Sequence, residues 1–175
     1  IGAGQSYFRH IADARIAAAL SCFRATSQFS HIAECTAVLI CVPTPLDDHL
    51  QPDLRFIEQT VITIAPHLRP GTLVVLESTT WPGTTVEVVK PLLEAGSGLK
   101  VGTDLHLAFS PEREDPGNDH FSTRTIPKLV GGYDATSRDL AVALYQAVVE
   151  QVVAVSSTQV AEMAKLFEKR LGRRA

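Results

Sequence analysis

The run AVLICV at residues 37–42 decides the fold of this chain, because it is continuously apolar, partly β-branched and followed directly by Pro43. A short apolar run that ends in a strand breaker predicts a β-strand buried on both faces, which is the usual environment of strands in parallel sheets. Runs of the same kind predict further strands at residues 72–78 (TLVVLES), 105–110 (LHLAFS), 128–132 (KLVGG) and 151–156 (QVVAVS).

Helical patterns fill the segments between these runs. Asp53 is expected to cap one of the helices. Strands that alternate with helices of about ten to fifteen residues predict an α/β fold with right-handed crossovers and a parallel sheet covered on both faces. The predicted helices cover residues 8–20, 53–67, 84–94 and 135–149, with a last one from about Thr158. The apolar residues expected to face the sheet are Phe56, Ile57, Val61 and Ile64, then Leu140, Leu144 and Val148, and finally Val160, Ala164 and Phe167.

Composition favours one soluble globular domain. The chain has 175 residues, 45% of them hydrophobic and 20% charged, with a formal net charge of -3. No overall positive field is present to attract nucleic acid or an anionic membrane, and no apolar run approaches the length of a membrane span. The opening IGAGQSYFRH is unlike a signal peptide, so a cytoplasmic location is expected.

The cysteine and histidine spacing predicts neither a disulfide framework nor a metal site. Three cysteines, Cys22, Cys35 and Cys41, are widely spaced and are expected to be buried thiols. No pair among the six histidines has the spacing of zinc ligands.

The glycine pattern lacks the GxGxxG motif that usually opens a dinucleotide-binding domain. Gly2 and Gly4 follow no predicted strand, and no third glycine stands at the required position. Gly131 and Gly132 end a predicted strand, where we expect a turn with positive φ and not a phosphate cradle.

Polar motifs follow three of the predicted strands. They read CVPTPLDD (41–48), ESTTWPGTT (77–85) and SPEREDPGN (110–118). Ligands of open α/β sheets bind outside the carboxyl ends of the strands, so these loops are the candidate functional residues.

Six motifs in order, the three above with QPDLRFI, IPKLVGG and AEMAKLFE, resemble the UDP-sugar 6-dehydrogenase family over nearly the whole chain. The SPEREDPGN wording is most similar to the branch that acts on UDP-N-acetylhexosamines. The resemblance implies that residues 1–155 are part of an NAD-binding, Rossmann-like domain and that residues 156–175 begin a long central helix. The chain then looks like an excerpt without the glycine loop, the first βαβ unit or the domain that carries the catalytic cysteine, and its first strand is expected to lie at an unpaired sheet edge.

The family reaction implies roles for three residues in this sequence. It oxidises the sugar C6 alcohol to a carboxylate in two hydride transfers to NAD, through an aldehyde held by a cysteine. By resemblance, Thr79 positions a water, Glu112 acts on that water as a general base, and Lys165 stabilises negative charge at the C6 oxygen.

The resemblance also assigns binding residues. Val42, Pro43, Thr44, Ser78 and Thr79 would contact NAD. Glu112, Arg113, Glu114 and Lys165 would contact the UDP-sugar.

The chain departs from the family pattern at two places, because Pro116 replaces a glutamate of the UDP-glucose branch and Lys169 replaces an asparagine. Cys41 lies inside the predicted strand, so we expect a packed thiol and not the family nucleophile.

Two functions stay open at this point. The first is part of an NAD-dependent dehydrogenase of UDP-N-acetylhexosamines, cytoplasmic, serving polysaccharide synthesis, and a homodimer or larger assembly when complete. The second is a catalytically inactive nucleotide-binding or interaction module derived from that family.

We expect the isolated chain to show no dehydrogenase turnover, because its sequence contains neither a matched nucleophile nor a pyrophosphate loop. The test is the absorbance of NADH after NAD and UDP-N-acetylglucosamine are added. NADH formed in proportion to the amount of chain would contradict this expectation.

Overall fold

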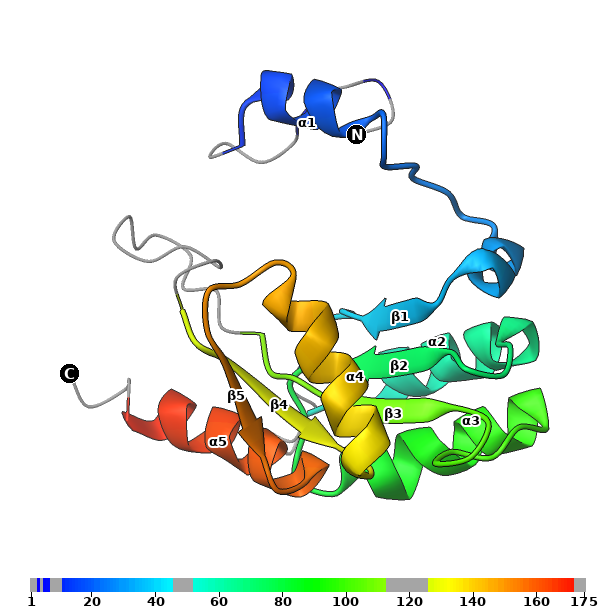
Figure 1. Cartoon of the computed structure of the whole chain (residues 1–175), viewed down its shortest axis with the longest axis vertical. Helices are drawn as coiled ribbons and strands as arrows, with labels where there is room; N and C mark the ends of the chain where they lie inside the picture. The colour runs from blue at the N-terminus through cyan, green and yellow to red at the C-terminus, as the bar shows by residue number, and fades with distance from the viewer. Residues whose placement is uncertain (1–2, 4, 7–10, 46–51, 113–125, 172–175) are drawn as a thin grey trace.

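The computed structural model describes residue 3, residues 5–6, 11–45, 52–112 and 126–171, and contains one five-stranded sheet with helices on both faces (Figure 1). The strands lie in the order β1-β2-β3-β4-β5, so each strand is beside its neighbour in the sequence. They are β1 (Ala37–Ile40), β2 (Leu73–Leu76), β3 (His106–Phe109), β4 (Lys128–Gly132) and β5 (Val152–Val155). All five predicted strands are therefore present, and the α/β fold class is confirmed.

The sheet is mixed, which corrects the prediction that it is wholly parallel. β1, β2 and β3 are parallel, β4 runs antiparallel to β3, and β5 is parallel to β4. A parallel neighbour needs a crossover connection, usually a helix, whereas an antiparallel neighbour does not. The sequence predicts no helix between β3 and β4, and this absence is the signal that the chain reverses there.

The predicted helices are all present with changed bounds: the first is shorter, the third extends to Ser97, and a short 3-10 helix at Phe29–Glu34 was not predicted. The second predicted helix is α2 followed by a 3-10 turn, and the third begins as one turn of π-helix. None of the helices in the described part of the chain is long and apolar enough to cross a membrane. The helical elements are α1 (Asp13–Ala19), η1 (Phe29–Glu34), α2 (Arg55–Ile64), η2 (Ala65–His67), η3 (Thr85–Val89), α3 (Lys90–Ser97), α4 (Ala135–Gln146) and α5 (Thr158–Leu171).

Alternate residues of the strands face two separate apolar cores. On β2, Val74 and Leu76 belong to the core formed with α2, α3 and α5, whereas Leu73 and Val75 belong to the core formed with α4. This two-residue alternation follows from the pleat of a strand. Figure 1 shows α4 crossing one face of the sheet while α2 and α3 cover the other.

β1 is an edge strand, and the prediction that it is buried on both faces is wrong. Ile40 is buried, but Leu39 is 43% exposed. α4 lies against β2, β3, β4 and β5. On the same face of β1, Ala37 packs at the margin of the core beneath α4, whereas Leu39 lies outside that core. β2, in contrast, is buried at every residue, as predicted.

Two helices turn a different face to the sheet from the predicted one. α4 buries Ala141 and Tyr145, while Leu140 and Val148 are exposed and Leu144 is half-buried. α5 buries Ala161 and Glu162 and exposes Val160 and Phe167. On α4 the buried positions lie one residue after predicted ones, and on α5 they lie one and two residues after Val160. The backbones at the starts of both helices approach β4 closely, which favours the small Ala141 and Ala161 on the buried faces. On α2, Ile57, Val61 and Ile64 are buried as predicted, and only Phe56 is exposed.

Gly131 and Gly132 lie within β4 and not in a turn, so the expected positive φ is wrong for both. Close approach of neighbouring backbone explains them. A Cβ on Gly131 would collide with the carbonyl oxygen of Ser157 at the start of α5, and a Cβ on Gly132 would collide with the backbone nitrogen of Arg138 in α4.

We expect Gly131→Ala to lower the free energy of unfolding by about 2–3 kcal/mol, because the added methyl overpacks a contact with main chain that cannot rotate away. Chemical denaturation measures the loss. Gly71→Ala is the control: it has open space around it and only its φ of 87° to oppose a side chain, so a loss of about 1 kcal/mol is expected. Equal losses in the two variants would contradict the packing argument.

Candidate active site

The carboxyl ends of β1, β2 and β3 meet at one edge of the sheet. Ile40, Leu76 and Phe109 are paired across the three strands, so the residues that follow them start at the same level. The ladder continues past the strands: the Glu77 N–H donates to the Ile40 carbonyl at 3.0 Å, and the Glu112 N–H donates to the Glu77 carbonyl at 3.4 Å. The described parts of the three polar motifs, residues 41–45, 77–85 and 110–112, therefore start side by side, as predicted from the strand order.

Ser78 joins the first two of these loops. Its buried hydroxyl accepts a hydrogen bond from the Val42 N–H at 2.9 Å and donates to the Val42 carbonyl at 2.7 Å. These bonds fix the turn that leads to Pro43, which is exposed, and to Thr44, which is half-buried. The Ser78 hydroxyl is therefore used in hydrogen bonds to this loop. Its predicted contact with the nicotinamide end of NAD stays a prediction.

Two threonines follow Ser78 and differ in exposure. Thr79, the predicted water-positioning residue, is half-buried. Thr80 is 1% exposed, and its hydroxyl oxygen is buried with no hydrogen-bond partner among the described residues. A buried hydroxyl without a protein partner normally bonds to water or a ligand, so this end of β2 retains an unused polar group at the site.

Glu162 ties α5 to the loop after Thr79. Its fully buried carboxylate accepts hydrogen bonds from the Gly83 N–H at 2.6 Å, the Thr85 N–H at 2.9 Å and the Thr85 hydroxyl at 2.6 Å. The two N–H groups belong to the first turn of a helix, which lacks intrahelical acceptors for them. Burial raises the pKa of the Glu162 carboxyl, and the bonds from Thr85 and Gly83 oppose that shift.

Lys165, three residues after Glu162 on α5, reaches the third loop. Its ammonium donates a hydrogen bond to the backbone carbonyl of Glu112. Two of the three predicted catalytic residues are therefore in contact, although through the main chain of Glu112. The Glu112 carboxylate is half-exposed, and Glu112 joins the Thr79 loop through the backbone bond to Glu77.

A buried charged group that the sequence analysis missed lies directly beneath this site. Glu77 accepts a hydrogen bond from the Lys128 ammonium at 3.2 Å through Oε2 and one from the Tyr145 hydroxyl through Oε1. The Lys128 ammonium also lies 3.9 Å from Glu112 Oε2 and 5.0 Å from the centre of the Tyr145 ring. Burial, and next the charge of Glu77, raises the pKa of the Tyr145 phenol far above its ordinary value, so it remains a donor.

The signal for this group was present in the sequence. Glu77 ends a run that is otherwise apolar, LVVLE, and Lys128 starts another, KLVGG. Charged residues at the ends of buried strands need partners of opposite charge. Only the pairing of β2 with β3 and of β3 with β4 shows that Glu77 and Lys128 are partners.

The cysteines are not buried, which corrects the prediction. Cys22, Cys35 and Cys41 are all exposed. Partial desolvation, followed by the charges of Glu77 and Glu112, raises the pKa of the Cys41 thiol to about 11. Cys41 is therefore protonated at neutral pH and unsuited to nucleophilic attack.

Several predicted residues cannot be placed. Arg113, Glu114, Asp115 and Pro116 lie outside the described residues, as do Gly2 and Gly4. Within the described ranges, no three His, Cys, Asp or Glu side chains are gathered as a metal site requires.

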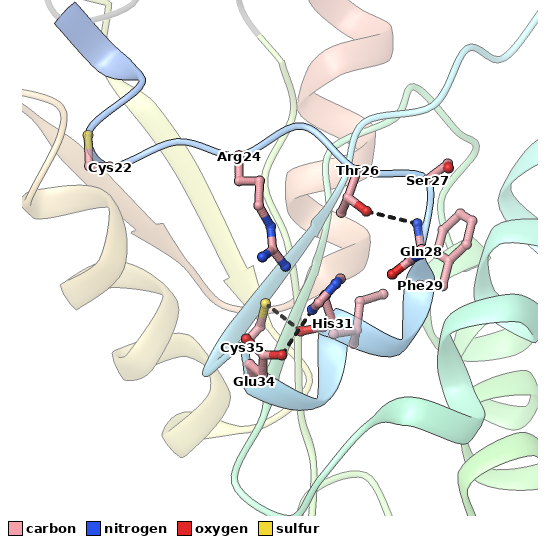
Figure 2. A pocket seen from close by; sticks show the side chains of 10 residues that line it. Cys22, Arg24, Thr26, Ser27, Gln28, Phe29, His31, Glu34 and Cys35 are labelled. Atoms are coloured by element: carbon pink, nitrogen blue, oxygen red, sulfur yellow. Dashed lines mark hydrogen bonds and ion pairs between the residues drawn. The ribbon is translucent and has the colours of Figure 1, made fainter. Parts of the chain in front are cut away.

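A separate hollow of about 610 Å³ is lined by residues of the segment from Cys22 to Cys35 (Figure 2). Arg24 points toward His31 and Glu34, whose side chains are 2.9 Å apart. The hydrogen bond from His31 lowers the pKa of the exposed Glu34. η1 leads into the amino end of β1, so this hollow lies at the opposite end of the strand from the polar motifs and is not part of the candidate site.

Comparison with known proteins gives a family match over most of the chain. Residues 8–149 match the NAD binding domain of the UDP-glucose/GDP-mannose dehydrogenase family. The Protein CapL of Staphylococcus aureus is 38% identical over 82% of this chain and 34% of its own length. The UDP-N-acetyl-D-glucosamine 6-dehydrogenase of Pseudomonas aeruginosa is 35% identical, also over 82% of this chain and 34% of its own length. The chain thus spans about a third of the length of these curated relatives.

Solved structures agree in fold. The NDP-N-acetyl-D-galactosaminuronic acid dehydrogenase of Methanosarcina mazei Go1 is 35% identical with a TM-score of 0.87, over 95% of this chain and 37% of that one. A ternary complex of GDP-mannose dehydrogenase from Pseudomonas aeruginosa is 25% identical, also with a TM-score of 0.87, over 99% of this chain and 41% of that one.

We expect stability to depend on pH through Glu162. Because its pKa is raised in the folded chain, the folded state holds this proton more tightly than the unfolded state, and stability falls as pH rises from about 4.3 through the raised value. Glu162→Gln removes that titration. The free energy of unfolding of the parent, minus that of Glu162→Gln, should therefore decrease with rising pH in urea denaturation. A difference that is constant or increases with pH would contradict the assignment.

Proposed function

Because this chain belongs to the UDP-glucose/GDP-mannose dehydrogenase family and carries its NAD-binding domain, we propose that it forms the NAD-facing and sugar-facing part of a UDP-N-acetylhexosamine 6-dehydrogenase. The observation that carries the proposal is the meeting of three polar motifs at the carboxyl ends of β1, β2 and β3, with Lys165 of α5 bonded to the third. Relatives named for UDP-N-acetyl-D-glucosamine and UDP-N-acetyl-D-mannosamine support the acetylated sugar as the substrate class.

The NAD side of the site consists of Val42, Pro43, Thr44 and Ser78, with Thr79. The turn that Ser78 holds presents exposed Pro43 and half-buried Thr44 beside the sheet edge. The Thr80 hydroxyl, which has no hydrogen-bond partner in the part of the chain that the structure describes, fits a polar ligand or its water at the same edge. These residues would hold NAD, which would supply the hydride acceptor for both oxidations at the sugar C6.

The catalytic side consists of Thr79, Glu112 and Lys165. The Thr79 hydroxyl both donates and accepts, so it can orient a water or the C6 hydroxyl. The half-exposed Glu112 carboxylate is placed to take a proton from that group. Lys165 donates a hydrogen bond to the Glu112 carbonyl, and its positive charge beside that loop would stabilise a negative oxygen at C6. Glu112, Arg113, Glu114 and Lys165 together would contact the sugar nucleotide.

In this proposal residues 1–155 belong to the NAD-binding domain, and residues 156–175 begin the central helix, of which α5 would be the first turns. The whole enzyme would be a cytoplasmic homodimer or larger assembly that supplies oxidised nucleotide sugars for polysaccharide synthesis.

An inactive binding module is the second candidate. This candidate keeps the same ligand edge and differs only in lacking turnover.

We expect NAD and UDP-N-acetylglucosamine to perturb the amide NMR signals of Val42, Thr44, Thr79 and Glu112 in the isotopically labelled chain. Thr79→Val should weaken the binding about tenfold, because it removes one hydrogen bond to the ligand and keeps the shape of the side chain.

Thr63→Val is the matched control, because Thr63 is an exposed threonine on α2 whose hydroxyl bonds to Gln59. It should leave the binding unchanged. Ligand effects confined to residues 22–35, or no effect at concentrations of about 1 mM, a usual upper value for Michaelis constants, would contradict the proposal.

A further inference from the structure

Lys128 is a buried cation in a position where charge is costly. Its side chain is 6–7% exposed, and its ammonium is enclosed by the Glu77 carboxylate and the Tyr145 ring. Replacing a buried ion pair by well-packed apolar residues is often neutral or stabilising, so the pair is weak evidence for a purely structural role. The position of the Lys128 charge, beneath the candidate site, suggests a functional role.

The orientation of Lys128 is set by groups from three elements. Tyr145 of α4 donates to one oxygen of Glu77, and Lys128 of β4 donates to the other, so both carboxylate oxygens are satisfied. Glu77 itself is held in the sheet ladder, because its N–H donates to Ile40 and its carbonyl accepts from Glu112. The ammonium is therefore fixed relative to the strand ends.

The fixed Lys128 ammonium also lies close to the carboxylate of Glu112, the candidate general base. The Glu112 Oε2 atom lies 3.9 Å from Lys128 Nζ, and 48% of the Glu112 side chain is exposed to solvent. On its other side, the Glu112 carbonyl accepts the hydrogen bond from Lys165. Glu112 is thus held by one lysine through its carboxylate and by another through its main chain.

We propose that Lys128, oriented by Glu77 and Tyr145, is a positioning residue that holds the Glu112 carboxylate at the C6 end of the site. This inference rests on the proposed function, in which Glu112 is the general base. Lys128 touches neither sugar nor NAD in this arrangement and acts through Glu112. The buried Glu77 serves to orient the cation, and Tyr145 serves to orient Glu77.

The test is the carbon NMR signal of the Glu112 carboxyl in the full chain at neutral pH, assigned by its loss in Glu112→Gln. Lys128→Met alone would leave Glu77 buried without its cation and could unfold the chain. The informative variants are therefore Lys128→Arg, which keeps the cation, and Glu77→Gln with Lys128→Met, which removes the buried pair together. The Tyr145 hydroxyl can still donate to the amide oxygen of Gln at position 77.

We expect the Glu112 signal to stay near its parent position in Lys128→Arg and to move, in the double variant, toward the signal of the exposed Glu87. The Glu162 carboxyl signal should stay in place in both variants, because Glu162 bonds to Gly83 and Thr85 and not to this group. A general structural change would move both signals, so the comparison separates positioning from folding.

A Glu112 signal that is the same in the parent and the double variant overturns the inference. If that occurs while NAD and UDP-N-acetylglucosamine still perturb Thr79 and Val42, only the role of Lys128 fails. If the Glu112 signal depends on Lys128 but neither ligand perturbs the chain, the proposed function fails. The catalytic role inferred for the contact between Lys128 and Glu112 then fails as well.

Discussion

The in-register parallel pairing of β1, β2 and β3 is the constraint on which the rest of the molecule depends. It brings Ile40, Leu76 and Phe109 to one level, so three loops that are distant in the sequence start side by side. A shift of one residue in this register would turn the side chains of a strand to its other face and mix the two cores. The same pairing therefore determines both the packing of the helices and the composition of the candidate site.

Close packing around β4 positions the helices that flank the candidate site. Gly131 and Gly132 have no side chains, and the backbones of α5 and α4 occupy the space where a Cβ would lie. This approach places α5 so that Glu162 reaches the first turn of η3 and Lys165 reaches the loop after β3. Backbone contact at Gly131 thus helps to place two charged side chains of α5 at the strand ends.

Buried charge is concentrated at this end of the sheet. Glu77, Lys128 and Glu162 are each less than 10% exposed, and each has hydrogen-bond partners that offset its desolvation. A core built only for stability would not need these groups. Their position next to Thr79 and Glu112 connects the energetics of the fold to the chemistry proposed for it.

The sequence by itself determined the five strands, the α/β class, the family and the three motifs that meet at the strand ends, because apolar runs and strand-end polarity are local properties. Tertiary structure alone decided the reversed direction of β4, the exposure of Leu39 on β1, the faces of α4 and α5 that are buried, and the contacts among Glu77, Lys128 and Tyr145. Each of these depends on which segments become neighbours, and helical periodicity does not distinguish Leu140 and Leu144 from Ala141 and Tyr145 until the sheet is in place. The partner of a buried charge is likewise known only once the chain has brought residues 77, 128 and 145 together.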